Sequence, residues 1–236
     1  MIKSIEGRRG FIKLGGLFIA AAAAGNVFPY TKAILPGPDN SEEKVSPSED
    51  LMREHGVLKR ILLIYEEIID RIKSNSDFPV KTLSDSAEMI KNFVEDYHEK
   101  LEEDHLFPRF RKAGKLVDLV NTLQTQHDRG RVLTGKIISL SQKADLKDES
   151  KSKELISYMH SFIRMYSPHE AREDTVLFPA FKSIVSSNEY DSLGEDFEKK
   201  EEQLFGEDGF GKMVDKVAGL EKTLGIYDLS KFTPKV

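Results

Sequence analysis

The chain has 236 residues and no cysteine, which excludes disulfides, iron–sulfur clusters, thiolate metal sites and a cysteine nucleophile. It has no excess of positive charge either. Its formal net charge of −5 argues against a general attraction to nucleic acid. The apolar run at residues 14–24 is shorter than the roughly 20 residues that a membrane-spanning helix needs. With 39% hydrophobic and 32% charged residues, the composition is typical of a soluble helical protein rather than a disordered chain.

The first 25 residues have the layout of an export signal. Arg8 and Arg9 precede Phe11-Ile12-Lys13, an apolar run follows, and five alanines, Ala20 to Ala24, close it. This pattern resembles the twin-arginine export signal, which implies export to the periplasm or beyond by the twin-arginine machinery. A plain secretory signal and an uncleaved membrane anchor are the alternatives, and cleavage would leave no membrane span. Residues 26–49 contain four prolines and several polar residues, which predicts a flexible linker.

The rest of the chain contains an internal repeat. Two segments fit the pattern His-Glu-x-x-Glu-acid-x-x-Leu-Phe-Pro-x-Phe and lie 71 residues apart, His98 to Phe110 and His169 to Phe181. Another histidine precedes each segment, since His55 lies 43 residues before His98 and His127 lies 42 residues before His169. A repeat of this length predicts two copies of one helical hairpin.

Helical periodicity places these histidines on core-facing stripes. The first stripe follows a spacing of four and three residues and consists of Leu51, His55, Leu58, Leu62, Tyr65, Ile69 and Ile72. Residues 74–79 form a predicted turn midway between His55 and His98, and the polar stretch 143–150 has the same place in the second copy. Residues equidistant from the turn of an antiparallel hairpin lie side by side. We therefore predict an all-α protein whose residues 50–182 form an antiparallel up-down four-helix bundle with four histidines in one layer.

Two carboxylates join this layer, because residues i and i+4 share one face of a helix. A buried carboxylate is costly unless it is paired or binds a cation. The sequence therefore predicts a binuclear metal site formed by His55, His98, Glu102, His127, His169 and Glu173. Imidazole and carboxylate ligands suit iron, manganese or zinc. A single His-x-x-x-Glu is more often a surface ion pair, and a single core histidine is more often a packing residue, so the prediction rests on their repetition. His105 and His160 have no counterpart in the repeat and are expected to be structural and solvent-facing, respectively.

The order and spacing of these residues and the two Leu-Phe-Pro tails resemble the hemerythrin-like, or His-His-Glu cation-binding, domain family. The resemblance covers about residues 48–182. It implies a four-helix bundle with two non-haem iron ions, bridged by oxo or hydroxo and by both glutamates, held by the six residues above. Oxygen carriers of this family usually have a further histidine at the position of Arg131. This departure favours a more open site, and Arg131 has two possible roles, an ion pair with an inner carboxylate or exposure to solvent. Gly130 and Thr134 are small enough either to leave room for a diatomic ligand or to allow close helix packing.

Three functions follow from the resemblance. The first is an exported di-iron protein that binds oxygen or nitric oxide for sensing, scavenging or delivery. The second is a di-iron oxidoreductase that removes peroxide or reactive nitrogen species. The third is iron storage or transfer. Residues 183–236 lie beyond the bundle, and their apolar spacing predicts a short helical extension that packs on it.

Overall fold

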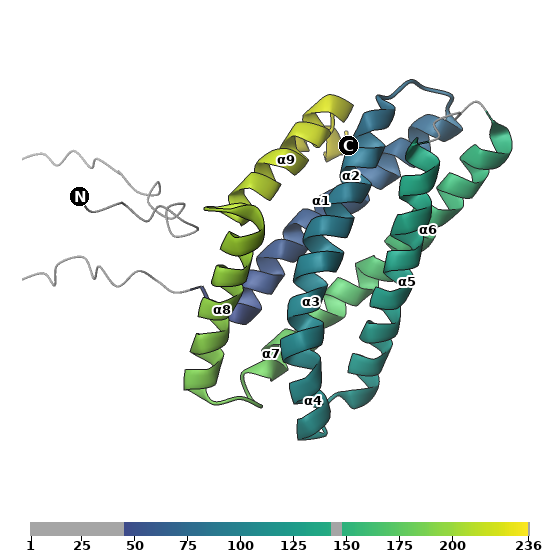
Figure 1. The fold of residues 1–236 in the computed structure, drawn as a ribbon. Coiled ribbons are helices and arrows are strands. Elements are labelled where there is room, and N and C mark those ends of the chain that lie inside the picture. Colours follow the sequence, from purple (N-terminus) through teal and green to yellow (C-terminus); the bar gives the residue numbers. More distant parts are fainter. Residues whose placement is uncertain (1–44, 143–147, 236) are drawn as a thin grey trace, which may run out of the picture. The chain divides into compact units, whose positions relative to one another are not determined.

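The computed structural model describes residues 45–142 and 148–235, and within these ranges all regular secondary structure is helical (Figure 1). The predicted signal segment and most of the predicted linker lie outside the described residues. The α-helices are α1 Pro47–Lys73, α2 Val80–Met89, α3 Glu99–Leu101, α4 Phe107–Ala113, α5 Val117–Gln142, α6 Glu149–Arg172, α7 Phe178–Phe181, α8 Ser187–Phe205 and α9 Gly209–Leu224. Three π-helical turns, η2 Ile90–His98, η3 Glu102–Leu106 and η4 Glu173–Leu177, and a final 3₁₀ turn, η5 Leu229–Phe232, complete the elements.

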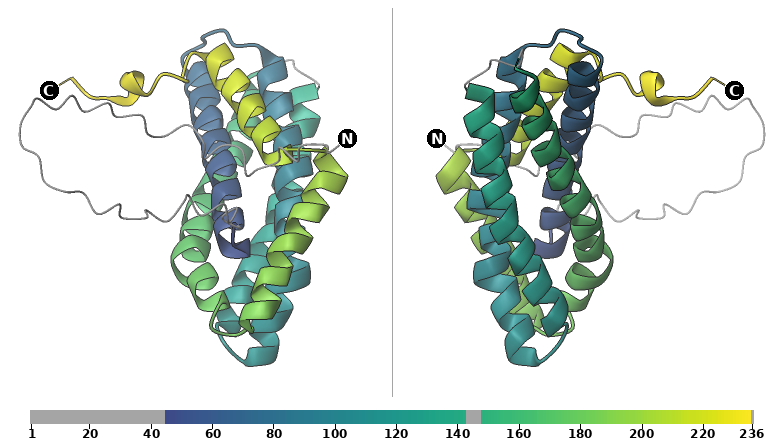
Figure 2. Two further views of the ribbon diagram at one scale, coloured as in Figure 1. Left: turned by 90° about the vertical axis from the view of Figure 1, so that its left-hand side faces the viewer. Right: turned by 90° about the vertical axis from the view of Figure 1, so that its right-hand side faces the viewer.

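These elements form four long rods, and the predicted all-α bundle is confirmed. The first rod is α1, the second runs without a break from α2 to α4, the third is α5, and the fourth joins α6 to α7. The rods pack as α1 against α6, α2 against α5 and α5 against α6. Figure 2 shows that α5 and α6 lie on the face of the bundle opposite α8 and α9. The interior stripe of α1 is buried as the periodicity predicts, with only its last residue, Ile72, partly exposed.

Local signals explain where the rods begin and end. The Ser46 side chain accepts a hydrogen bond from the Glu49 N–H, and Pro47 occupies the first turn, where its missing N–H costs nothing. The first helix therefore begins at Pro47, three residues inside the stretch expected to be linker. At the end of the second rod, Gly114 adopts a left-handed conformation with φ of 64°, which stops α4.

Neither motif proline ends its rod. Pro108 lies in the first turn of α4 and directly follows the π-helical turn η3, and α7 follows η4 in the same way. In each case the N–H of the residue before the proline bonds to the carbonyl oxygen five residues earlier, Glu102 or Glu173. The second rod therefore continues through Pro108 to Ala113.

The C-terminal helices pack on the bundle through α1. A bidentate ion pair joins Arg60 to Glu221, with the Nε–Oε1 distance at 2.9 Å. The Arg71 guanidinium donates a hydrogen bond to the Leu224 carbonyl oxygen at the C-terminus of α9. Apolar residues of both helices, among them Phe197 and Val217, are fully buried. The extension also contacts the second rod, since α9 packs on α2 and Phe205 of α8 packs on Phe93, so it covers α1 and the second rod and lies away from α5 and α6.

Candidate metal centre

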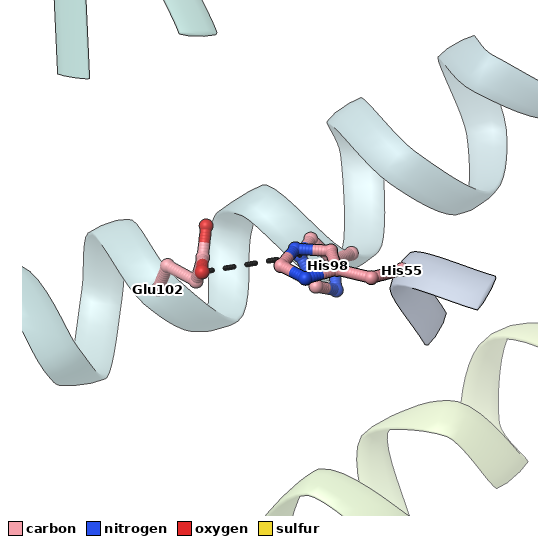
Figure 3. A group of neighbouring side chains, drawn as sticks. All are labelled: His55, His98 and Glu102. Carbon is pink, nitrogen blue, oxygen red and sulfur yellow. Dashed lines mark hydrogen bonds and ion pairs between the residues drawn. The ribbon is translucent and has the colours of Figure 1, made fainter. Parts of the chain in front are cut away.

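The four rods bring the six predicted ligand side chains to one level of the bundle interior. Within the first hairpin the Nε2 atoms of His55 and His98 lie 3.1 Å apart, and within the second those of His127 and His169 lie 3.2 Å apart. Figure 3 shows His55 and His98 side by side with Glu102 directed toward them. The histidines that lie at equal distances from each predicted turn therefore form two pairs of imidazoles whose Nε2 atoms face each other.

Each inner carboxylate connects the two hairpins. Glu102 has one oxygen 3.9 Å from His98 Nε2 and the other 3.4 Å from His127 Nε2. Glu173 Oε2 lies 3.1 Å from His169 Nε2 and 3.4 Å from His55 Nε2. Both glutamates therefore face one imidazole of their own hairpin and one of the other.

The chemistry of these donors fits metal ions. Glu102 and Glu173 have no exposed surface, and among the described residues none of their four carboxylate oxygens has a hydrogen-bond partner. Burial, together with the negative charge of Glu173, raises the pKa of Glu102 well above its usual value. Two unpartnered carboxylates facing four imidazole nitrogens in a dry interior are stabilised by bound cations and are costly without them.

The outer nitrogen of every imidazole is held by an oxygen atom. His55 Nδ1 lies 2.7 Å from Asp174 Oδ1, and His127 Nδ1 lies 3.1 Å from Glu103 Oε1. The other two partners are Glu54 for His98 and Gln126 for His169, each at 2.8 Å. Because each Nδ1–H donates to such an oxygen, each Nε2 is the nitrogen that faces inward and can serve as a metal ligand once it is deprotonated.

These contacts also set the protonation of His55. Burial by itself lowers the pKa of its imidazole, but the hydrogen bond to Asp174 and the negative charges of Glu173 and Asp174 outweigh burial and raise the pKa to about 9. In His127 burial has the larger effect and lowers the pKa to about 4. Protons therefore compete with a cation more strongly at His55 than at His127.

Arg131 does not reach the centre, and it is paired rather than free in solvent. Its guanidinium lies 2.6 Å from Glu103 Oε1 and 2.8 Å from Glu99 Oε2. Lys59 has the matching place in the first copy, 3.1 Å from Asp174 Oδ2. Of the two roles open to Arg131, the structure favours an ion pair with carboxylates behind the imidazoles.

Aromatic residues enclose the histidines. Phe178 stacks on His55 and Phe107 stacks on His127, each at a ring-centroid distance of 5.4 Å and an interplanar angle of 24°. Both phenylalanines come from the Leu-Phe-Pro tails, so these tails cover the imidazoles in addition to filling the core. The rings exclude water from one side of each histidine pair, which strengthens electrostatic interactions within the site.

Gly130 provides space for a side chain of the protein. The hydroxyl of Tyr166 occupies the position next to its Cα, and a Cβ placed on Gly130 would lie 2.8 Å from Tyr166 Cζ. The same hydroxyl donates a hydrogen bond of 2.6 Å to Glu99 Oε1. Of the two roles considered for Gly130, close packing is the one observed.

The sequence did not indicate the outer partners of the imidazoles. Glu54 and Gln126 directly precede predicted ligands, while Glu103 and Asp174 directly follow them, and their recurrence at equivalent places of the repeat was the available signal. The two remaining histidines lie away from the centre. His105 is half-buried and packs on Phe197 at 5.4 Å, and His160 is exposed as expected.

The fold and the site together define a class of protein, a four-helix bundle with a buried histidine–carboxylate centre suited to metal ions. A profile of the hemerythrin HHE cation binding domain matches residues 46–179. The chain therefore belongs to this family, and its His/Glu clusters fit metal binding. Among the described residues, no helix combines the length and the apolar character that crossing a membrane requires.

Two mycobacterial proteins are similar to most of the chain. An uncharacterized protein of Mycobacterium tuberculosis (strain ATCC 25618 / H37Rv) is 50% identical over 200 residues, which cover 84% of this chain and 78% of the relative. An uncharacterized protein of Mycobacterium bovis has the same identity and coverage. No solved structure matches the chain at a significant level.

Proposed function

We propose that the protein is an exported non-haem di-iron protein that binds a small ligand such as oxygen or nitric oxide, for sensing, scavenging or delivery. One observation carries the proposal. Glu102 and Glu173 each face imidazoles of both hairpins, and their buried oxygens have no hydrogen-bond partner among the described residues. Two cations bridged by two carboxylates satisfy all of these atoms, whereas a single cation leaves part of the donor set uncompensated.

Iron is the proposed metal because of the donor set. Four imidazoles and two carboxylates without any thiolate suit iron, manganese and zinc, and a carboxylate-bridged pair in a four-helix bundle is a known arrangement for iron. The residues that would hold the ions are His55 and His98 on one side, His127 and His169 on the other, and the two glutamates between them. Bound iron would supply redox chemistry and positions for an exogenous ligand.

Arg131 supports an open site. Its guanidinium is held by Glu99 and Glu103, so the position does not contribute a further ligand to the centre. Six side chains shared by two ions would leave room for a small exogenous ligand at the centre. Such room suits ligand binding, and it also suits the second candidate, a di-iron oxidoreductase that removes peroxide or reactive nitrogen species. Iron storage or transfer is a third candidate, and the experiments below distinguish all three.

Metal analysis and optical spectroscopy test the proposal. The purified protein should contain about two iron ions per chain, and the anaerobically reduced form should develop a visible absorption band with oxygen or nitric oxide. A band that reverses when the gas is removed supports ligand binding. Turnover of peroxide supports the oxidoreductase, and rapid loss of iron to an acceptor supports transfer. Protein that retains neither iron nor another divalent metal would refute the proposed centre.

Export rests on the N-terminal sequence and is tested separately. We propose that residues 1–25 direct the folded protein to the twin-arginine machinery and are then removed, which leaves it in the periplasm or outside the cell. Replacement of Arg8 and Arg9 by lysine should retain the protein in the cytoplasm with its N-terminus intact. Unchanged export of that variant, measured by cell fractionation and intact mass, would contradict this route.

A further inference from the structure

The internal repeat allows the outer partners of the two histidine pairs to be compared position by position. His55 contacts Asp174 and His127 contacts Glu103, so both first histidines of the hairpins have a carboxylate behind them. A cation stands behind each of these carboxylates, since Lys59 lies 3.1 Å from Asp174 and Arg131 lies 2.6 Å from Glu103. A further buried glutamate accompanies each cation, Glu170 for Lys59 and Glu99 for Arg131. In these three pairs of positions the two halves have the same formal charge.

The fourth pair of positions differs in charge. His98 Nδ1 lies 2.8 Å from the carboxylate of Glu54, a residue only 2% exposed. At the equivalent place His169 Nδ1 lies 2.8 Å from the amide oxygen of Gln126. The two distances are equal, so the two contacts differ in the charge of the acceptor and not in their length. One imidazole is backed by a carboxylate and the other by a neutral amide.

This difference changes the basicity of the inner nitrogens. A carboxylate that accepts the Nδ1–H bond increases electron donation from Nε2 to a metal ion, and a neutral amide oxygen increases it less. Hydrogen bonds to charged partners are also roughly twice as strong as neutral ones. The imidazole of His98 is therefore the better donor and is held more firmly than that of His169.

The cations behind the carboxylates, Lys59 and Arg131, increase the difference in donor strength between the two histidine pairs. Arg131 lies 2.6 Å from Glu103 and is 27% exposed, whereas Lys59 lies 3.1 Å from Asp174 and is 52% exposed. A closer and less solvated cation neutralises more of the carboxylate charge that acts on the adjacent imidazole. The negative charge of Glu103 therefore increases the basicity of His127 less than that of Asp174 increases the basicity of His55. The difference between Glu54 and Gln126 also makes the first histidine pair the stronger donor.

We infer that the two ends of the centre, compared with their imidazoles deprotonated, bind metal unequally, with the ion held by His55 and His98 bound more tightly and the ion held by His127 and His169 lost and exchanged first. The inference rests on the proposed metal centre and adds the positioning residues that rank its two ends, Glu54 and Gln126. Changes to the outer partners of metal-bound histidines typically alter metal affinity 10- to 100-fold. We therefore expect the replacement of Glu54 by Gln126 at the equivalent position to account for about a tenfold difference in affinity between the two ends.

Titration of the metal-free full chain with Co(II), in competition with a chelator and at several pH values so that proton release can be subtracted, tests the ranking. The wild type should bind two ions in two resolved steps. Gln126→Glu should strengthen the weaker step about tenfold and leave the stronger step unchanged, and Glu54→Gln should weaken the stronger step about tenfold. Both substitutions preserve side-chain size and an oxygen acceptor, and circular dichroism verifies that each variant is folded. Effects on the opposite steps, or on neither, would overturn the inference.

Proton NMR of samples with one equivalent of Co(II) identifies the filled end directly. Imidazole N–H protons of cobalt-bound histidines are shifted far outside the usual range. Glu54→Gln should move one of these signals in the singly loaded protein, and Gln126→Glu should leave them unchanged. The reverse pattern would refute the ranking. Failure of the wild type to bind Co(II) would refute the proposed centre itself, whereas two bound ions with steps that ignore both substitutions would refute only the inference.

Discussion

Gly130→Ala tests the packing around the centre most sharply. A Cβ at this position would overlap the Tyr166 hydroxyl and lie 2.8 Å from Cζ and 3.0 Å from Cε2. Tyr166 is only 1% exposed and its hydroxyl bonds to Glu99, so the ring has no free space to move into. The added methyl group must therefore displace either the tyrosine or the helix that carries residue 130.

The magnitude follows from three contributions. Overpacking a well-filled core costs about 1–3 kcal/mol. Loss of the hydrogen bond from Tyr166 to Glu99 costs a further 0.5–1.5 kcal/mol or so, because burial raises the pKa of Glu99 to about 8 and leaves this acceptor mostly neutral at pH 7. The better helix propensity of alanine returns about 1 kcal/mol. We expect the free energy of unfolding to fall by about 2 kcal/mol.

Chemical denaturation followed by circular dichroism measures this change, and α5 provides a matched control. Gly135 lies on the same helix, and a Cβ there would meet nothing within 4 Å. Gly135→Ala should therefore stabilise the protein by up to about 1 kcal/mol. Adding Tyr166→Phe to Gly130→Ala should recover only part of the loss, since Cζ remains 2.8 Å from the new methyl group. If Gly130→Ala were as stable as Gly135→Ala, the space beside Gly130 would be open and our description of it wrong.

The remaining predictions concern the centre itself. Glu102→Gln and Glu173→Gln should each reduce the bound metal below two ions per chain in elemental analysis, because each removes a charge that faces both histidine pairs; full retention would exclude a bridging role. Removal of metal should lower the melting temperature, since buried unpaired groups would remain, and equal melting temperatures with and without metal would contradict this. Metal loading at pH 7 should release at least one proton, because the His55 pKa of about 9 keeps that imidazole protonated in the metal-free protein. Metal affinity should accordingly rise as the pH approaches 9, and the part of the metal-free protein's stability that comes from protonated His55 should be complete below pH 6.5 and disappear as the pH passes 9. Calorimetry in buffers of different ionisation enthalpy measures the protons, and a pH-independent affinity would refute the assignment.

The sequence alone determined the helical rods, the repeat and the six residues that converge. Helical spacing fixes which residues share a face, so the stripe through His55 had to turn inward with its leucines. Equal distances from a turn fix which residues lie side by side within one hairpin, and this placed His55 beside His98. Both rules act within one helix or one hairpin, where the chain itself supplies the geometry.

Contacts between the hairpins were decided only by the tertiary structure. Asp174 reaches His55 across 119 residues of sequence, and Glu103 reaches His127 in the other direction. Arg131 and the hydroxyl of Tyr166 meet at Glu99 by the same packing. Such contacts depend on how two rods are rotated and shifted against each other. Shape and side-chain packing along the whole interface set this rotation and shift. They cannot be predicted from the periodicity or the residue spacing within one rod.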